Sequence, residues 1–475
     1  MKRLFTIFAT FAMLCAVGCE EQGSDDVTPN DKPGTEQPDE KPNEDGNGDS
    51  EIANLPPANE IWYTSTDGLV VTPYFEVNWD GDSVFGANIV SNTYEDGKGV
   101  IAFDGDVTHI GYWAFYECAT LASIILPNGV TSIGANVFYN CNSLKSFTLP
   151  NSVTSIGSGA FSSCLSLTNA IIPDSVTEIG GWVLAGCLNL SEIKCRFASD
   201  NGRCLIIDGT LNSFAPAGLT KYNIPDGVTS VGETVFVHCS DLTSVTIPDS
   251  VTSIENGAFA GCSSLTSVTI PDSVTSIENS AFAGCSSLTS LIIPKSVTSI
   301  GASAFYGCTG TLVINSKILE PDYSYEDYPS FSYSIYSGWL YGANFSTIVI
   351  GKNVTKLGTN VLRDCVSLVS IVIPDSVTSI GVAAFYECSS LTSITISESV
   401  TSIGAHAFDY CTSLTEVYCK AITPPNGVEY YGSWSAFDNN ASERKIYVPS
   451  ESVDAYKTAE YWCDYADNIE GYDFE

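Results

Sequence analysis

The chain has 475 residues, 44% of them hydrophobic, and its 55 acidic residues outnumber 19 basic ones, which gives a formal net charge of −36. This length exceeds what one compact core usually supports, so the chain holds either several domains or an elongated repeat array. The acidic balance argues against binding to nucleic acid, whose phosphates need a basic surface, and against a polybasic membrane patch.

The first 18 residues form an expected export signal. A basic pair at residues 2–3 precedes an apolar stretch over residues 4–17, which is too short to span a bilayer. The stretch ends in A-V-G-C, which resembles a bacterial lipobox, although Ala16 stands where that motif prefers leucine. The resemblance implies that Cys19 becomes a lipidated N-terminus; the alternative is plain secretion. The acidic residues after Cys19 are similar to surface-export signals, so we expect an outer-membrane lipoprotein exposed at the cell surface.

Residues 19–57 are rich in proline and acidic residues and carry almost no large apolar side chain. Such a composition cannot bury enough surface to fold, so we expect a disordered tether. Residues 58–106 contain E-I-W-Y-T-S and F-E-V-N-W-D-G, which are typical of short strands and predict an N-terminal β cap. In this cap Ile101 and Phe103 match the apolar positions of the repeat that follows, which predicts an incoming half-rung.

A repeat dominates residues 107–420. The pattern V-T-x-[IVL]-x-x-x-x-[AV]-[FL]-x-x-C returns mostly after 23 residues, as from Val251 to Val274. A fixed period in this range predicts a solenoid. The copies begin at Val107, Val130, Val153, Val176, Val228, Val251, Val274, Val297, Val354, Val377 and Val400.

The apolar positions predict how one unit folds. After each cysteine comes L-x-x-[VI]-x-I-P, in which Val268 and Ile270 alternate with the period of a strand, and Pro271 ends strand pairing. D-S-V-T-S-I predicts a turn and a second extended piece, and G-A-F-A-G-C predicts a tight arc. Because one unit cannot bury its apolar side alone, the units must stack, and their main strands are expected to form one long parallel sheet.

The whole unit, L-x-x-[VI]-x-I-P-x-x-V-x-x-I-G-x-x-A-F-x-x-C, resembles the BspA-like leucine-rich repeats of bacterial surface proteins over residues 98–420. The resemblance implies a curved, right-handed leucine-rich-repeat solenoid, mainly β, with short helical or irregular arcs. It also implies an adhesion or binding protein, without naming a partner.

The period breaks twice, between Val176 and Val228 and between Val297 and Val354. We interpret both breaks as degenerate rungs with insertions, at about 195–220 and 315–345. Residues 421–475 are expected to cap the far end with a strand and a helix from about Glu451 to Ile469, because apolar residues recur there at helical spacing.

Most of the 17 cysteines occupy one repeat position. Stacking would place them in a row with parallel side chains, which suits buried thiols better than disulfides. No C-x-x-C pair occurs, so zinc is not expected. Cys195 and Cys204 are the best disulfide candidates, and their state stays open. The row comprises Cys118, Cys141, Cys164, Cys187, Cys239, Cys262, Cys285, Cys308, Cys365, Cys388 and Cys411.

No catalytic pattern is evident. The three histidines, His109, His238 and His406, lie in different repeats and should not meet, so a Ser/His/Asp or Cys/His system is not supported. No nucleotide-binding motif occurs. We therefore expect no catalytic residues, no metal, no cofactor and no enzymatic activity.

Two surfaces are candidates for binding. The outward strand positions include Thr246, Thr269, Ile292 and Thr395, although such residues also suit any solvated strand. The second insertion is rich in aromatics, which either bind a ligand or pack on one another. The expected partners are host or microbial surface and matrix proteins; the alternatives are glycan capture for nutrient uptake, or a structural spacer. The aromatic candidates are Tyr323, Tyr325, Tyr328, Tyr333, Tyr336, Trp339 and Tyr341.

Overall fold

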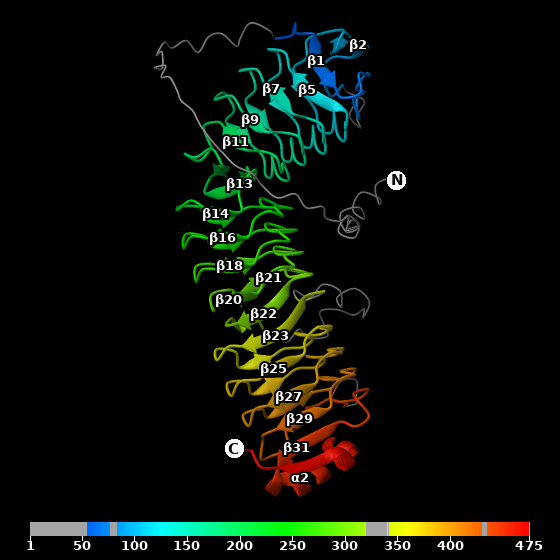
Figure 1. Ribbon diagram of the computed structural model, residues 1–475, viewed down its shortest axis with the longest axis vertical. Coiled ribbons are helices and arrows are strands. Elements are labelled where there is room, and N and C mark those ends of the chain that lie inside the picture. The colour runs from blue at the N-terminus through cyan, green and yellow to red at the C-terminus, as the bar shows by residue number, and fades with distance from the viewer. Residues whose placement is uncertain (1–54, 77–82, 320–339, 341, 430–434, 475) are drawn as a thin grey trace, which may run out of the picture. The chain divides into compact units, whose positions relative to one another are not determined.

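The computed structural model describes residues 55–76, 83–319, 340, 342–429 and 435–474. The chain divides into residues 1–53 and a second unit, residues 54–475, to which all described residues belong. In this second unit short strands stack one after another as the rungs of a parallel β-solenoid (Figure 1). The predicted leucine-rich-repeat solenoid with capped ends is confirmed.

Each regular rung supplies a main strand and a second, shorter strand. Val245 pairs in parallel with Val268 in the main sheet, and Ile254 pairs with Ile277 in the second sheet. The main strands are β5 (Leu121–Ile125), β7 (Ser146–Thr148), β9 (Asn169–Ile171), β11 (Glu192–Lys194), β14 (Lys221–Asn223), β16 (Ser244–Thr246), β18 (Ser267–Thr269), β20 (Ser290–Ile293), β22 (Thr309–Ile314), β23 (Asn344–Ile350), β25 (Ser370–Val372), β27 (Ser393–Ile396), β29 (Glu416–Cys419) and β31 (Lys445–Pro449).

Most of the second strands follow the V-T pair of the repeat, whereas β13 (Thr210–Phe214) follows the hairpin turn after β12 (Cys204–Ile207). The second strands are β4 (His109–Ile110), β6 (Ser132–Ile133), β8 (Ser155–Ile156), β10 (Glu178–Ile179), β13 (Thr210–Phe214), β15 (Ser230–Val231), β17 (Ser253–Ile254), β19 (Ser276–Ile277), β21 (Ser299–Ile300), β24 (Lys356–Leu357), β26 (Ser379–Ile380), β28 (Ser402–Gly404) and β30 (Asn426–Val428). The arcs that close the rungs are turns and contain no helix in the described repeats.

The repeat's apolar residues fill the interior between the two sheets. In the rung of β18, Leu265 is fully buried, and Val268 and Ile270 are nearly so. The arc phenylalanines stack face to face along the interior: the ring centroids of Phe259 and Phe282 lie 5.1 Å apart, with planes 4° from parallel. Burial of a phenylalanine side chain stabilises the fold by about 1.5–3 kcal/mol, and only stacked rungs achieve this burial.

The threonines of the V-T and L-T pairs have a structural role that the sequence did not reveal. Thr252 donates its hydroxyl to the carbonyl of Thr229, and Thr275 donates to Thr252, each at 3.2 Å. A second such row includes Thr266, whose hydroxyl reaches the carbonyl of Thr243 at 3.0 Å. These hydroxyls bond the backbone of one rung to that of the next.

The main sheet is not continuous, contrary to the prediction. Strand pairing stops between β7 and β9, between β11 and β14, and between β18 and β20, after which β20 to β31 pair without a break. The rungs still stack across the last gap, where the Thr289 amide donates to the carbonyl of Thr266 at 3.2 Å.

The N-terminal cap is antiparallel. β1 (Glu60–Ser65) lies between β3 (Lys98–Phe103) and β5, and β2 (Ile89–Glu95) forms the edge beyond β3. Ile101 and Phe103 are buried as expected. β3 pairs with β1, which separates it from the first main strand, whereas β4, which follows β3 in the chain, pairs in parallel with β6 as the second strand of the first rung.

The first insertion forms an antiparallel hairpin of β12 (Cys204–Ile207) and β13. β13 then takes the place of a second strand and pairs in parallel with β15. Two hydrophobic cores meet at this hairpin: Leu205 belongs to the core of the N-terminal rungs, whereas Leu211 and Phe214 belong to that of the C-terminal rungs. At the second insertion the described chain contains a 3₁₀ turn, Lys317–Leu319.

The C-terminal cap differs from the predicted single helix. After β31 and a 3₁₀ turn, Ser450–Ser452, helix α2 (Val453–Thr458) ends where Ala459 becomes extended. Tyr461 has a positive φ of 69°, which no helix continues through, and a 3₁₀ segment, Trp462–Asn468, leads into β32 (Ile469–Tyr472). β32 pairs in parallel with β31 and so covers the last main strand.

Candidate binding surface

The central outward residues of the main strands form a line that we call the outer row. From β20 to β31 these positions are direct lateral neighbours: Ile292 pairs with Val313, Val313 with Val349, and Tyr418 with Tyr447. Ile292 is 52% exposed and Val349 44% exposed, although both are β-branched aliphatic residues. The described members are Ile125, Thr148, Ile171, Lys194, Asn223, Thr246, Thr269, Ile292, Val313, Val349, Thr395, Tyr418 and Tyr447.

The four strand residues predicted as binding candidates all point outward. Thr246, Thr269 and Ile292 are exposed, and Thr395 is half-buried. Within the described chain the hydroxyls of Thr246 and Thr269 make no hydrogen bond to the protein, unlike the threonines that bond rung to rung. These two hydroxyls therefore remain available to a ligand.

A groove lies where pairing stops between β18 and β20. It has a volume of about 390 Å³ and is lined by Thr269 and Ser267 from one side and by Ile292 and Ser290 from the other. At this point the outer row changes from hydroxyl to aliphatic side chains. An aliphatic floor edged by hydroxyls resembles the lining of protein sites that accept a partner's side chain.

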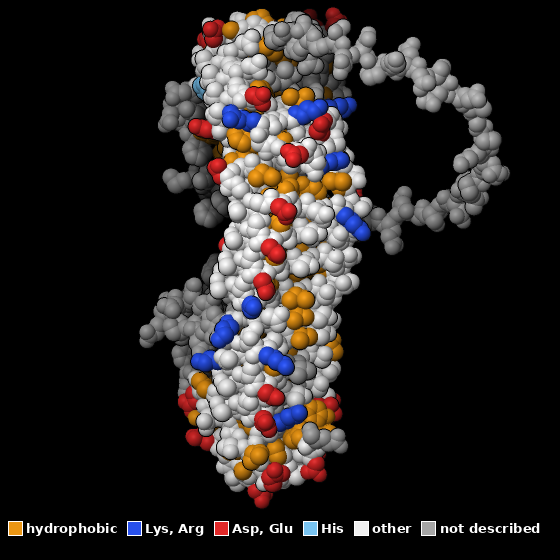
Figure 2. Space-filling model, turned by 90° about the vertical axis from the view of Figure 1, so that its left-hand side faces the viewer, with side chains coloured by type: hydrophobic (Ala, Val, Ile, Leu, Met, Phe, Trp, Pro, Cys, Tyr) orange, Lys and Arg blue, Asp and Glu red, His pale blue; other side chains and the backbone are white. Residues whose placement is uncertain are grey.

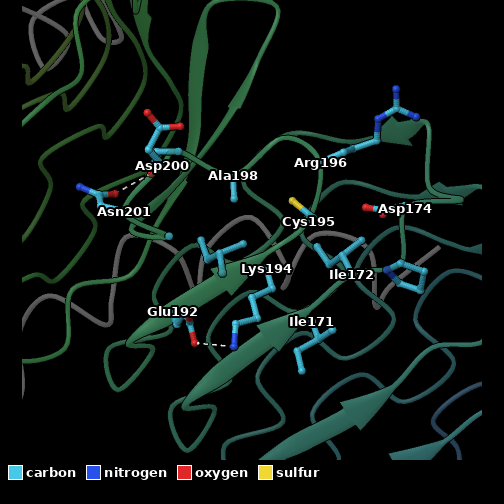
Figure 3. A pocket seen from close by; sticks show the side chains of 14 residues that line it. Ile171, Ile172, Asp174, Glu192, Lys194, Cys195, Arg196, Ala198, Asp200 and Asn201 are labelled. Carbon is cyan, nitrogen blue, oxygen red and sulfur yellow. Dashed lines mark hydrogen bonds and ion pairs between the residues drawn. The ribbon is translucent and has the colours of Figure 1, made fainter. Parts of the chain in front are cut away.

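A second groove lies at the end of β11, beside the first insertion. It has a volume of about 660 Å³, and Ile171 stands exposed in its lining (Figure 3). The Lys194 Nζ lies 3.1 Å from the Glu192 carboxylate, so this ion pair sits on the groove's exposed wall. Burial raises the pKa of the Cys195 thiol in the same lining, so this thiol is a poor nucleophile at neutral pH.

Charged side chains flank the outer row at the P-x-S turns. On the face shown in Figure 2, acidic side chains follow one another in a column that basic ones interrupt, with hydrophobic side chains beside it. Asp249 and Asp272 are exposed at these turns, and the Lys295 Nζ lies 3.9 Å from the Asp272 carboxylate. The rim is therefore polar and of mixed charge.

Aromatic residues close the outer row at its C-terminal end. The rings of Tyr418 and Tyr447 stack 5.0 Å apart with planes 20° from parallel, and Tyr472 meets Tyr418 edge to face at 5.4 Å. These rings cover one another's faces, so they offer edges and hydroxyls to a partner.

The aromatic candidates of the second insertion, Tyr323, Tyr325, Tyr328, Tyr333, Tyr336, Trp339 and Tyr341, lie outside the described residues. Cys19, the tether and the signal segment lie outside them as well. Their predicted roles remain predictions.

The cysteine row is a ladder of free thiols, as predicted. All eleven cysteines are unpaired, and all but Cys118 are buried. Most donate to the carbonyl of the residue at the phenylalanine position one rung earlier: Cys262 reaches Phe236 and Cys308 reaches Phe282, each at 3.0 Å. Burial raises the pKa of Cys118 and of Cys262 to about 12. Cys195 and Cys204 are also free thiols.

The structure brings together one Ser/His/Asp group that sequence reasoning missed. The Asp409 carboxylate lies 2.6 Å from His406 Nδ1, and the Ser435 hydroxyl donates to the same carboxylate at 2.9 Å. Ser435 Oγ also faces Nδ1, at 3.1 Å, whereas a nucleophilic serine must face the imidazole nitrogen opposite the one that its aspartate holds. Burial raises the pKa of Asp409, and His406 opposes that rise. These three side chains link the last repeat, which contains His406 and Asp409, to the C-terminal cap, which contains Ser435.

Other chemistry is sparse in the described ranges. They contain no group of three metal-ligating side chains. None of their helices is both long and apolar enough to cross a bilayer.

Comparison with known families decides the classification. The model of the BspA type leucine-rich repeat region matches residues 98–200, 210–322 and 333–466. The chain belongs to the BspA-type leucine-rich repeat family. The six matched copies extend past the regular rungs into the C-terminal cap, as far as residue 466. Members of this family and fold are typically non-catalytic.

Solved structures of other leucine-rich repeat proteins are similar to this chain. One from Bacteroides ovatus is 25% identical, with 80% of this chain and 90% of that chain covered and a TM-score of 0.47. A leucine-rich cell surface protein from Faecalibacterium prausnitzii is 27% identical, with 81% and 87% covered and a TM-score of 0.32. One from Eubacterium ventriosum is 24% identical, with 66% and 82% covered and a TM-score of 0.42. No curated protein sequence matches.

Proposed function

We propose that this BspA-type protein is a non-catalytic adhesion or binding protein that engages host or microbial surface proteins through its outer row. The observation that carries the proposal is the unbroken line of lateral neighbours from Ile292 to Tyr447, in which the aliphatic Ile292 and Val349 are exposed and the aromatic Tyr418 and Tyr447 are half-buried. The fold does not require apolar side chains at this strand position, since in other rungs the position holds the hydroxyl residues Thr246 and Thr269.

Protein interfaces combine an apolar centre with a polar rim, and pockets receive anchoring side chains. The outer row supplies the centre, and the exposed serines and turn carboxylates supply the rim. The groove beside Ile292 can accept one anchor from the partner. Export and lipid attachment at Cys19 would present this surface outside the cell.

The test is binding of the purified full chain to immobilised extracellular-matrix and cell-surface proteins. We expect saturable binding to at least one of them, weakened by Ile292→Asp. Ser286→Asp is the matched control, because it adds the same charge to an exposed turn of the same rung, before β20. Deleting residues 320–339 tests the aromatic insertion separately. Absence of binding across the panel, with hits on a glycan array instead, would favour nutrient capture; no hit in either screen would favour a spacer.

A further inference from the structure

A second group of aromatic side chains lies on the arcs of the first rungs, away from the outer row. We call Tyr74, Phe75, Trp113, Tyr116 and Tyr139 the arc cluster. Phe75 and Trp113 stack at 5.9 Å with planes 28° apart, and Tyr116 and Tyr139 stack at 5.3 Å with planes 6° apart. Tyr74 joins the two stacks, at 4.9 Å from Phe75 and 5.4 Å from Tyr116.

The repeat itself does not need these rings. At the position of Tyr116 and Tyr139 other arcs have Ala260 and Ala283, and at the position of Trp113 they have Gly257 and Ser280. Those arcs close with the same turn and the same buried phenylalanine. The aromatics are therefore additions to the arc surface and are not part of the rung core.

The cap segment holds Tyr74 in place across the first arc. The Tyr74 amide donates to the Ala114 carbonyl at 2.8 Å, and the Cys118 thiol donates to the Thr72 carbonyl at 3.5 Å. Tyr74 nevertheless remains 56% exposed, while Trp113, Tyr116 and Tyr139 are half-buried. The result is a firmly positioned surface of rings with polar tips.

The charges beside the arc cluster restrict the kind of ligand that it can bind. Glu117, which is exposed beside Tyr116, interacts with the Tyr116 hydroxyl. Burial raises the pKa of Tyr116 and of Tyr139, so both phenols stay protonated donors at neutral pH. Among the described residues no lysine or arginine lies over the face of any of these rings. Anionic ligands such as nucleic acids or sulfated glycans are therefore disfavoured.

We propose that the arc cluster binds a neutral carbohydrate chain. In the two stacked pairs of the arc cluster the rings cover one another's faces, so the exposed ring of Tyr74 is the one that offers a face to a pyranose. Aromatic faces carry negative charge, which attracts the polarised C–H face of the sugar. The sugar's hydroxyl edge can bond to the tyrosine hydroxyls and to the Glu117 carboxylate. The rungs repeat every ~4.8 Å, so Tyr116 and Tyr139 present successive contacts along an extended chain. This site lies apart from the outer row, so it stands or falls independently of the protein-binding proposal.

The test is affinity electrophoresis of the full chain in mild detergent, in native gels that contain soluble xylan, galactomannan or mixed-linkage β-glucan. We expect at least one polysaccharide to slow migration. The double variant Trp113→Ser, Tyr116→Ala should weaken this binding at least tenfold. It introduces residues that the chain itself has at these positions, and an unchanged melting temperature will show that it folds.

Tyr386→Ala is the matched control. Tyr386 occupies the same repeat position and also precedes a glutamate, but the Arg363 guanidinium lies 4.3 Å from its ring centre and covers the face. This variant, and Ile292→Asp on the outer row, should bind polysaccharide like the wild type. The proposal is overturned if none of the three polysaccharides slows the protein, or if the double variant is slowed equally. Salt-sensitive binding of poly-lysine that the double variant loses, without polysaccharide binding, would overturn it in favour of a cationic peptide.

Discussion

Threonine residues in the repeat serve two different purposes, which only their place in the rung distinguishes. Thr252 faces the preceding rung and donates its hydroxyl to a backbone carbonyl. Thr246 points outward from the main strand and is exposed. The first role stabilises stacking, whereas the second leaves a hydroxyl for a partner.

Replacing these two threonines with valine should separate the two roles. Thr252→Val removes a hydrogen bond and should lower the free energy of unfolding by about 1 kcal/mol. Thr246→Val should change it by less than about 0.5 kcal/mol, because no hydrogen bond to the protein is lost. Urea denaturation of the full chain measures both, and equal effects would contradict the assignment of roles.

The buried thiols predict a loss of stability in alkali. Burial raises the pKa of Cys262 from 9.0 to about 12, so above pH 9 the unfolded chain loses this proton while the folded chain keeps it. The free energy of unfolding must then fall as pH rises, by about 2 kcal/mol for this one thiol between pH 8 and pH 10.5.

Denaturation of the wild type and of Cys262→Ala at pH 8 and pH 10.5 measures how much of the loss of stability comes from this thiol. We expect the variant to lose less stability than the wild type over the same interval. Identical losses would mean that the thiol ionises as readily in the folded protein as in the unfolded chain.

At the scale of elements, the repeat pattern predicted the rungs well because each rung repeats a local sequence. The alternation of Val268 and Ile270 fixed which residues point inward, and the outward candidates followed from it. The cap was less predictable, because β1 pairs with β3 and β5, whose sequences lie far along the chain. The helix was predicted too long because a positive φ at Tyr461 cannot be read from apolar spacing.

The grooves and the polar group at the cap lay beyond sequence reasoning for a related reason. A groove forms where strand pairing stops, and the repeats around β18 and β20 are nearly identical in sequence. His406 and Ser435 lie 29 residues apart, and Ser435 lies beyond the last copy of the repeat, so the repeat pattern does not relate the two positions. The arc cluster did have a signal, because Trp113, Tyr116 and Tyr139 stand at positions where several other copies carry small residues.

The C-terminal cap should control the stability of the last rungs. Trp462 is fully buried and donates its indole N–H to the Pro425 carbonyl at 2.8 Å. Trp462→Ala should lower the free energy of unfolding by about 3–5 kcal/mol and expose the edge of a parallel sheet to aggregation. Denaturation and light scattering test this. Tyr461→Ala, at the more exposed neighbour, is the control and should stay soluble.

At the scale of the whole molecule, the hairpin of β12 and β13 joins two hydrophobic cores. In a repeat protein each unit contacts only its neighbours, so the total stability is approximately the sum of the units' own stabilities and of the interfaces between neighbours. Phe138→Ala and Phe282→Ala each remove a fully buried ring, one from each core, and each should cost about 3–5 kcal/mol. Hydrogen exchange should show increased exchange mainly within the altered core. Uniformly increased exchange across both cores would show that the hairpin does not separate them.

The family, the solenoid and the outer row together suggest a molecule built to display a long surface. Its stability comes from contacts between neighbouring rungs, so outward positions can vary without affecting the core. This separation explains how hydroxyl, aliphatic and aromatic segments succeed one another along one row.

The most direct test of the central claim compares the affinities of three forms of the full chain for a protein partner found in the panel. Ile292→Asp should weaken binding at least tenfold, about 1.4 kcal/mol, while Ser286→Asp should stay within about twofold of the wild type. Both variants should melt like the wild type. Equal affinities for Ile292→Asp and the wild type would contradict the claim that the outer row is the binding surface.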